Sequence, residues 1–173
     1  MEKFSVLFDK SVFTITAIVV LILVISLLSV FFVFKKSNNK TIVIIAYVLI
    51  FLPLVITSFF IPTSYSTSTK NIVIHKVLGK ISINNADINE IFVIHPQDLK
   101  RMYRTFACGG FGGYFGKYSS PKYGTLYVYA GTLSQNLVMI QLKDSTLYLI
   151  TPKEMDKFIE NSEISYQTGN SHD

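Results

Sequence analysis

Two long apolar runs near the start of the chain constrain its fold more than any other feature. No side chain is charged in residues 12–34 or 41–61, and the polar stretch 35–40 (KKSNNK) separates the two runs. Each run reaches the roughly 20 residues that an α-helix needs to cross a bilayer. A core helix of a soluble protein would carry a polar stripe, whereas residues 18–25 (IVVLILVI) are apolar on every face. The two runs therefore predict transmembrane helices.

We place this transmembrane hairpin at 11–61, with helices at about 11–34 and 41–61 after an N-terminal flank of 1–10. The first run is too long for the apolar part of a signal peptide and lacks a small-x-small cleavage site, so we expect no cleavage. Two crossings put both ends of the hairpin on one side of the membrane. More lysines lie near those ends than in the turn, which favours a cytoplasmic domain. The two groups are Lys3, Lys10, Lys70, Lys76 and Lys80 against Lys35, Lys36 and Lys40.

The rest of the chain suffices for one small domain. Of the 173 residues, about 110 follow the hairpin. Most of the formal charge of +5 lies beside the predicted helices, where it suits anionic lipid headgroups. The basic pI is therefore poor evidence for nucleic-acid binding. The single cysteine, Cys108, excludes an intramolecular disulfide.

Beyond a polar linker at 62–70, the period of the apolar residues changes from helical to two. This alternation, interrupted by turn residues, predicts short strands in an antiparallel meander. The expected strands are 71–76, 80–83, 91–94, 123–130, 137–142 and 146–150.

One amphipathic helix at 152–161 is expected to close the domain. The capping-box pattern marks its start, with Thr151 as N-cap, Pro152 at the first helical position and Glu154 at the third. The β domain with its closing helix then covers 71–162, and we expect a disordered tail at 163–173.

The glycine-rich stretch 108–116 (CGGFGGYFG) does not fit a nucleotide-binding loop. A Walker loop would need glycine in place of Phe111 and Ser or Thr in place of Tyr118, and a dinucleotide fingerprint would need glycine in place of Phe115. We expect instead that the glycines supply positive φ and close backbone approach at a bend or bulge between strands. These structural glycines are Gly109, Gly110, Gly112, Gly113 and Gly116.

The sequence contains no recognisable catalytic or metal-binding pattern. Cys108 could act as a nucleophile with His75 or His95 as its base, but no third orienting residue stands out, and a lone thiol is more often a small buried hydrophobe. The histidines have no ligand spacing with cysteine or carboxylate. We therefore expect no enzyme activity, no metal and no cofactor.

Basic residues gather on both sides of the glycine stretch. They are a candidate ligand or partner face near the membrane, and a plain solvated face is the alternative. The residues are Lys100, Arg101, Arg104, Lys117 and Lys122. The many aromatic residues nearby would suit single-stranded nucleic acid if one sheet face displayed them, but in a small β domain they more often form the core.

Residues 104–118 (RTFACGGFGGYFGKY), a tyrosine-rich strand ending in Tyr129-Ala130 and a closing Thr151-Pro152 helix resemble the bacterial pleckstrin-homology (PH)-like domain proteins, many of which have transmembrane helices ahead of the domain. The resemblance implies a mainly-β domain of about seven antiparallel strands in two sheets, capped by a C-terminal α-helix. The family has no established common ligand or reaction, so it supplies no catalytic residue. Residues 76–80, in the first hairpin, contain two lysines and no arginine, which argues against specific phosphoinositide binding.

These features predict a non-catalytic, membrane-anchored module that presents a PH-like domain at the membrane surface to a protein or peptide partner. The alternative is a module that binds anionic lipid or nucleic acid through the basic face around Lys100, Arg101 and Arg104, and a membrane-associated enzyme is a third class. The expected location is the bacterial cytoplasmic (inner) membrane. There the chain is a multi-pass protein in direct contact with the lipid bilayer.

Overall fold

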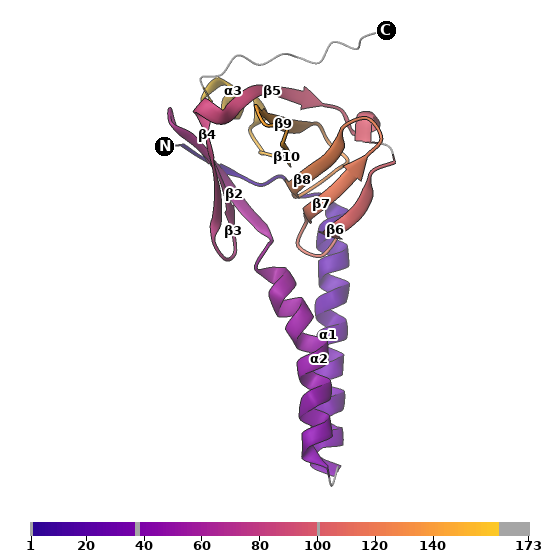
Figure 1. The fold of residues 1–173 in the computed structure, drawn as a ribbon. Coiled ribbons are helices and arrows are strands. Elements are labelled where there is room, and N and C mark those ends of the chain that lie inside the picture. The colour runs from indigo at the N-terminus through magenta and orange to yellow at the C-terminus, as the bar shows by residue number, and fades with distance from the viewer. Residues whose placement is uncertain (1, 37–38, 100, 163–173) are drawn as a thin grey trace.

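The computed structural model describes residues 2–36, 39–99 and 101–162, so the predicted tail at 163–173 lies outside the described residues. A long helical hairpin stands beneath a β domain (Figure 1). Two apolar helices, a mainly-β domain in two sheets and a short closing helix confirm the predicted fold class. In chain order, the elements are β1 (Glu2–Ser5), α1 (Lys10–Lys36), α2 (Lys40–Ser58), β2 (Pro62–Thr67), β3 (Asn71–Lys76), β4 (Lys80–Asn84), η1 (Asn85–Asp87), β5 (Ile88–Ile94), η2 (Pro96–Leu99), β6 (Tyr103–Gly109), β7 (Tyr114–Ser120), β8 (Gly124–Ala130), β9 (Leu137–Leu142), β10 (Leu147–Ile150) and α3 (Met155–Glu160).

Helices α1 and α2 run side by side away from the domain (Figure 1). Both helices carry apolar side chains on all faces, and only Val12 and Val43 among their described residues are buried. By length and composition, both helices can span a membrane. The Tyr47 hydroxyl donates to the Leu27 carbonyl at 3.2 Å and links the two helices.

Helix α2 ends at Ser58, three residues before the predicted boundary at 61. The amides of Phe59, Phe60 and Ile61 each donate to the carbonyl three residues earlier, at 3.2, 3.1 and 3.3 Å. Such tighter turns are common at helix ends, and here they redirect the chain into β2.

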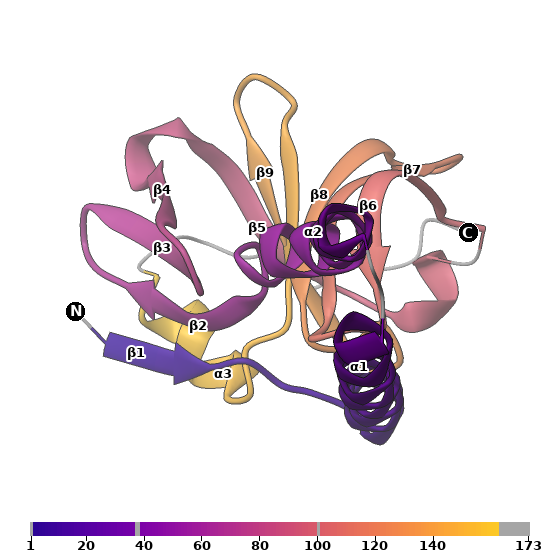
Figure 2. The ribbon, with the colours of Figure 1, turned by 90° about the horizontal axis from the view of Figure 1, so that it is seen from below.

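The N-terminal flank and the linker, both predicted to lie outside the domain, contain strands β1 and β2. They pair antiparallel from Glu2↔Thr67 to Ser5↔Ser64, as neighbours in a sheet of order β1-β2-β3-β4 (Figure 2). The prediction of a linker at 62–70 is therefore wrong. Its Ser and Thr residues are polar, but in the sheet they lie beside the fully buried Tyr65 and form the second strand.

The second sheet has six strands in the order β5-β9-β10-β8-β7-β6. The predicted meander is wrong in this sheet, because β10 pairs antiparallel with β9 and parallel with β8, and so lies between them. Residues 137–140 of β9 are buried on both faces, as an inner strand requires. Strand β7 emerges from the second half of the glycine stretch, where the sequence predicts only a bend or bulge.

Apolar side chains pack against both faces of the six-stranded sheet. One core cluster includes Ile140, Ile150 and Tyr65, and joins this sheet to the four-stranded sheet and α3. The other cluster fills the opposite face and includes Leu126, Val128, Met139 and Leu149.

The closing helix α3 docks on the first cluster. Phe158 is fully buried and packs edge-to-face on Phe4 and Tyr65, with ring centroids 5.3 and 6.4 Å apart. Helix α3 therefore covers the end of the sandwich near the N-terminal strand.

The capping box predicted for this helix is wrong. Helix α3 starts three residues later than expected, at Met155, and its N-cap is Glu154, whose side chain makes no cap hydrogen bond. Thr151 and Pro152 instead pair with the N-terminal segment, where the Leu7 amide donates to the Thr151 carbonyl at 2.8 Å. This long-range pairing holds the segment extended and prevents the local cap.

Candidate functional site

The domain is fixed to the hairpin at the first turn of α1. Asp9 precedes α1, and its Oδ1 accepts hydrogen bonds from the Val12 amide at 2.9 Å and the Ser11 hydroxyl at 2.6 Å, as a helix N-cap does. Its Oδ2 accepts from the hydroxyl of Thr132, after β8, at 2.8 Å. Burial raises the pKa of Asp9, but these hydrogen bonds outweigh burial and lower the pKa below its ordinary value. One carboxylate therefore caps the helix and holds the domain.

A second contact joins the hairpin to the turn between β6 and β7. The Gly112 amide donates to the Thr16 hydroxyl at 2.9 Å, and Ile61, just beyond α2, lies where a Cβ of residue 112 would stand. Gly112 has φ +67°, which glycine adopts without strain. A Cβ at Gly110, in the same turn, would lie 3.0 Å from Ile15 of α1. The turn can therefore approach both helices closely.

The other glycines of the stretch lie within the sheet or its turn. Gly109 ends β6, and Gly113 lies against the Ala130 carbonyl. Gly116 lies in β7 with φ +110°, paired with Ala107 of β6, and a Cβ there would collide with the Phe106 carbonyl oxygen. This placement favours the predicted structural role of the glycines.

Of the basic residues predicted as one face, Arg101 and Arg104 line one small cleft of about 250 Å³, and Lys117 lies apart from them. Arg104 pairs with Tyr118 on β7, the neighbour of Lys117, so Arg104 and Lys117 lie on opposite faces of the six-stranded sheet. Arg104 lies over Gly109, and Lys100 lies outside the described residues.

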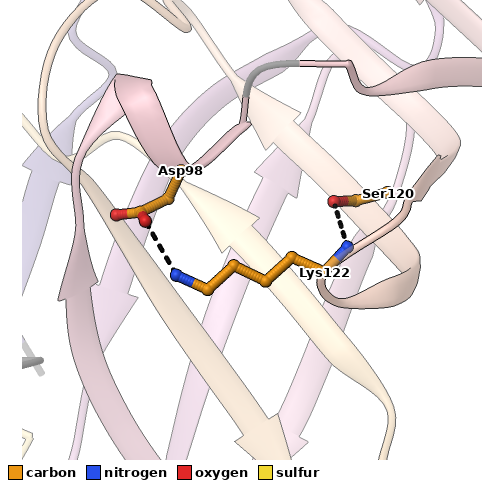
Figure 3. A network of polar contacts seen from close by, with 3 residues as sticks. All are labelled: Asp98, Ser120 and Lys122. Atoms are coloured by element: carbon orange, nitrogen blue, oxygen red, sulfur yellow. Dashed lines mark hydrogen bonds and ion pairs between the residues drawn. The ribbon is translucent and has the colours of Figure 1, made fainter. Parts of the chain in front are cut away.

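Lys122 forms an ion pair instead of contributing free charge. Its Nζ lies 2.7 Å from Asp98 Oδ1, and its amide donates to Ser120 Oγ at 3.3 Å (Figure 3). The hydrogen bond from Lys122 lowers the pKa of Asp98. Arg101 lies in an exposed turn after η2 with φ +75°. Of the described members of the set, Arg101 and Arg104 therefore lie together, whereas Lys117 lies on the other face of the sheet and Lys122 is paired with Asp98.

An apolar cavity of about 580 Å³ lies between the six-stranded sheet and the end of α2. We call it the junction cavity. Its volume falls within the range of about 300–1,000 Å³ that is usual for ligand sites. Its lining includes Phe60, Phe106, Cys108, Phe115, Tyr127 and Tyr129, with Lys117 as the charged residue.

Strand register places these lining side chains of β6, β7 and β8 on one face. Tyr127 pairs with Lys117 and Tyr129 with Phe115, whereas Leu126 on β8 points to the opposite face and joins the second core cluster. The four-stranded sheet covers this face mainly over β5, β9 and β10. The junction cavity therefore lies over the part of the sheet that the four-stranded sheet leaves open.

The chemistry around Cys108 does not favour a nucleophile. Burial raises the pKa of the Cys108 thiol, although Arg104 opposes this, so the reactive thiolate is disfavoured. His75 Nε2 lies 2.9 Å from Ser66 Oγ, and His95 Nδ1 lies 2.9 Å from Asn136 Oδ1, so each histidine has another partner.

His95 lines a separate polar cleft of about 810 Å³, together with Asp98, Asn136 and Lys153. Within the described residues, no group of three or more His, Cys, Asp or Glu side chains is arranged to hold a metal ion.

Sequence reasoning did not group the residues of the junction cavity: Lys117 was predicted for the basic face, Gly116 for the structural glycines, and Cys108 was considered only as a nucleophile. One signal was available: Tyr127 and Tyr129 alternate with Leu126 and Val128, which indicates a strand with one aliphatic and one amphipathic face. No local signal brings Phe60 to the cavity, because its position depends on where α2 ends. Asp9 carried an N-cap signal directly before the first apolar run.

Comparison with known proteins identifies the family. Residues 63–165 match a family model described as "Bacterial PH domain". Searches of curated proteins and of solved structures gave no significant match. The matched segment is more than half of the 173 residues and spans β3 to β10 and α3. With its two sheets and closing helix, the chain belongs to the bacterial PH domain family.

Proposed function

We propose that the chain is a non-catalytic, membrane-anchored interaction module. The hairpin crosses the bacterial cytoplasmic membrane twice and holds the PH domain at the cytoplasmic surface, where the domain binds a protein or peptide partner. The exposed apolar surfaces of α1 and α2 support the anchor, because a bilayer removes such surfaces from water. Lysines at the helix ends suit the headgroup regions: Lys10, Lys35, Lys36 and Lys40.

The observation that carries this proposal is the double attachment of the domain to the hairpin. Strands β1 and β2, which precede α1 and follow α2, are neighbours in one sheet. Asp9 bonds to Thr132, and Thr16 bonds to Gly112. These contacts fix the orientation of the domain relative to the helices, which suits a module that presents one surface to a partner.

The outer edge of β6 is the surface best suited to an extended partner. Strand β6 is the last strand of its sheet, and no other described strand pairs with its outer edge. Tyr103 and Phe106 on this strand are 62% and 84% exposed. A peptide can add to such an edge through main-chain hydrogen bonds, while exposed side chains supply specificity.

The topology is tested by labelling intact cells with a membrane-impermeant maleimide in a Cys108→Ser background. Lys36→Cys, at the end of α1 next to the turn between the helices, should react in intact cells, whereas Lys143→Cys, between β9 and β10, should react only after permeabilisation. The reverse pattern would place the domain outside the cytoplasm. Reaction of both residues in intact cells would contradict the hairpin.

The partner surface is tested with a photo-crosslinking amino acid at Tyr103 and, as a control, at Lys143. We expect discrete protein adducts from residue 103 only. Thr105→Pro should abolish them, because the β6–β7 register skips Thr105 and proline cannot donate to an added strand. Equal adducts from both positions, or adducts that survive Thr105→Pro, would contradict strand addition at β6.

A further inference from the structure

The walls of the junction cavity suit an apolar chain. Phe60, Phe106, Phe115 and Tyr129 supply aromatic surface, and none of its lining residues, all within the described part of the chain, is acidic. Burial raises the pKa of Tyr129, so its hydroxyl remains neutral. An apolar cavity with few polar groups fits a ligand with a hydrocarbon segment.

The position of the cavity indicates the source of a ligand with a hydrocarbon segment. Phe60 lies two residues beyond the end of α2, so the cavity begins where the second apolar helix ends. The turn between β3 and β4 is hydrogen-bonded to the residues just after α2. The Val77 amide donates to the Ile61 carbonyl at 3.0 Å, and the Leu78 amide donates to the Phe59 carbonyl at 3.1 Å. Val77 and Leu78 are themselves 55% and 61% exposed. Exposed apolar side chains therefore lie beside Phe60, between the end of the hairpin and the cavity.

Two cations contact the walls of this cavity. Lys117 lines the cavity, and Lys76 Nζ lies 5.3 Å from the centroid of the Phe60 ring. Neither lysine forms an ion pair with any described residue. Two ammonium groups without an ion-pair partner among the described residues, beside an apolar cavity, match the phosphate and acyl chain of an amphiphile.

We propose that the junction cavity binds one acyl chain of an anionic phospholipid drawn from the surrounding bilayer, with the lipid phosphate at Lys117 and Lys76. This inference rests on the proposed insertion of the hairpin. The bound lipid fills the side of the six-stranded sheet that the four-stranded sheet leaves open, and couples the domain to the lipid composition of the membrane.

The test uses the full chain in nanodiscs that contain phosphatidylglycerol with a diazirine in its acyl chain. After illumination, mass spectrometry locates the labelled peptides. We expect label on β6 and β8, around Cys108 and Tyr127, in addition to α1 and α2. Lys117→Glu should lower labelling of the strands about tenfold, the effect of losing one charge-assisted contact, and leave labelling of the helices unchanged. Lys143→Glu, with the same charge change outside the cavity, should alter neither.

A second variant, Cys108→Trp, fills the cavity and should remove the strand label while the circular dichroism spectrum is retained. Labelled helices with unlabelled strands would overturn the lipid site and leave the anchor intact. Unlabelled helices would overturn the anchor itself. Strand labelling that Lys117→Glu does not change, or that is equal with a phosphatidylcholine probe, would overturn the role of the anionic headgroup.

Discussion

The two halves of one face of the six-stranded sheet differ sharply. A single row of paired residues crosses all six strands of this face, from β5 to β6. The row begins with fully buried isoleucines on β5 and β9 and ends at β6 with a phenylalanine that is 84% exposed. The row is Ile91, Ile140, Tyr148, Tyr127, Lys117 and Phe106.

The residue type along this row changes where the four-stranded sheet and α3 no longer cover the six-stranded sheet. The four-stranded sheet and α3 bury the first half, where branched aliphatic side chains pack closely. The second half carries side chains with apolar bodies and polar tips, which tolerate partial exposure. The covered half should therefore determine stability, and the open half should determine binding. Three predictions test this division, and a fourth concerns the junction with the helices.

The largest effect is expected where the cover itself is removed. Phe158→Ala deletes the buried ring that packs on Phe4 and Tyr65, and should lower the free energy of unfolding by about 3–5 kcal/mol. Denaturation of the full chain in detergent micelles, followed by tyrosine fluorescence, measures this change. A loss no greater than that of Tyr127→Phe would mean that α3 is not docked on the sheets.

A smaller effect is expected from one buried hydroxyl. The Tyr65 hydroxyl donates to the Tyr129 carbonyl at 2.6 Å and accepts from the Thr151 amide at 3.3 Å. Tyr65→Phe leaves both groups buried without this partner, and should cost about 1–3 kcal/mol in the same denaturation experiment. A neutral result would show that water reaches the covered half.

The same substitution in the open half is the matched control. Tyr127 is half-buried and stacks on Tyr148 with ring centroids 5.6 Å apart, a contact that phenylalanine keeps. Tyr127→Phe should therefore change the unfolding free energy by less than about 0.5 kcal/mol. A loss as large as that of Tyr65→Phe would erase the difference between the two halves.

The smallest effect concerns the junction with the helices and depends on pH. The folded-state pKa of Asp9 is lowered, so its contribution to stability is present above its ordinary pKa of 3.8 and is lost as the pH falls through the folded value. Between pH 6 and pH 3, the Asp9→Asn variant should lose less stability than the natural chain. Parallel pH profiles for the two chains would show that Asp9 does not hold the domain.

Local patterns in the sequence were sufficient for much of the fold. The predicted strands 71–76 and 137–142 match β3 and β9 residue for residue, because each apolar segment is bounded by turn residues. The hairpin was equally clear, since two uncharged runs of this length fit few structures other than membrane helices.

The features that the sequence did not reveal depend on partners distant in the chain. The polar β2 becomes a strand because β1 and β3 pair with it on either side. Thr151 has the local signature of a helix cap, but pairing with the Leu7 segment prevents that conformation. The junction cavity exists only because α2 ends beside the open half of the sheet, so its residues could not be grouped from spacing alone.

The pairing of β1 with β2 has a consequence for biogenesis. Residue 2 leaves the ribosome long before residue 67, yet these residues pair in the finished sheet. In the proposed topology, the first strand must wait on the cytoplasmic side until both helices have inserted. In a chain that inserts only one helix, β1 and β2 would lie on opposite sides of the membrane. The sheet would then keep an edge with unpaired amides. Completion of the sheet therefore requires, in the proposed topology, that both helices have inserted.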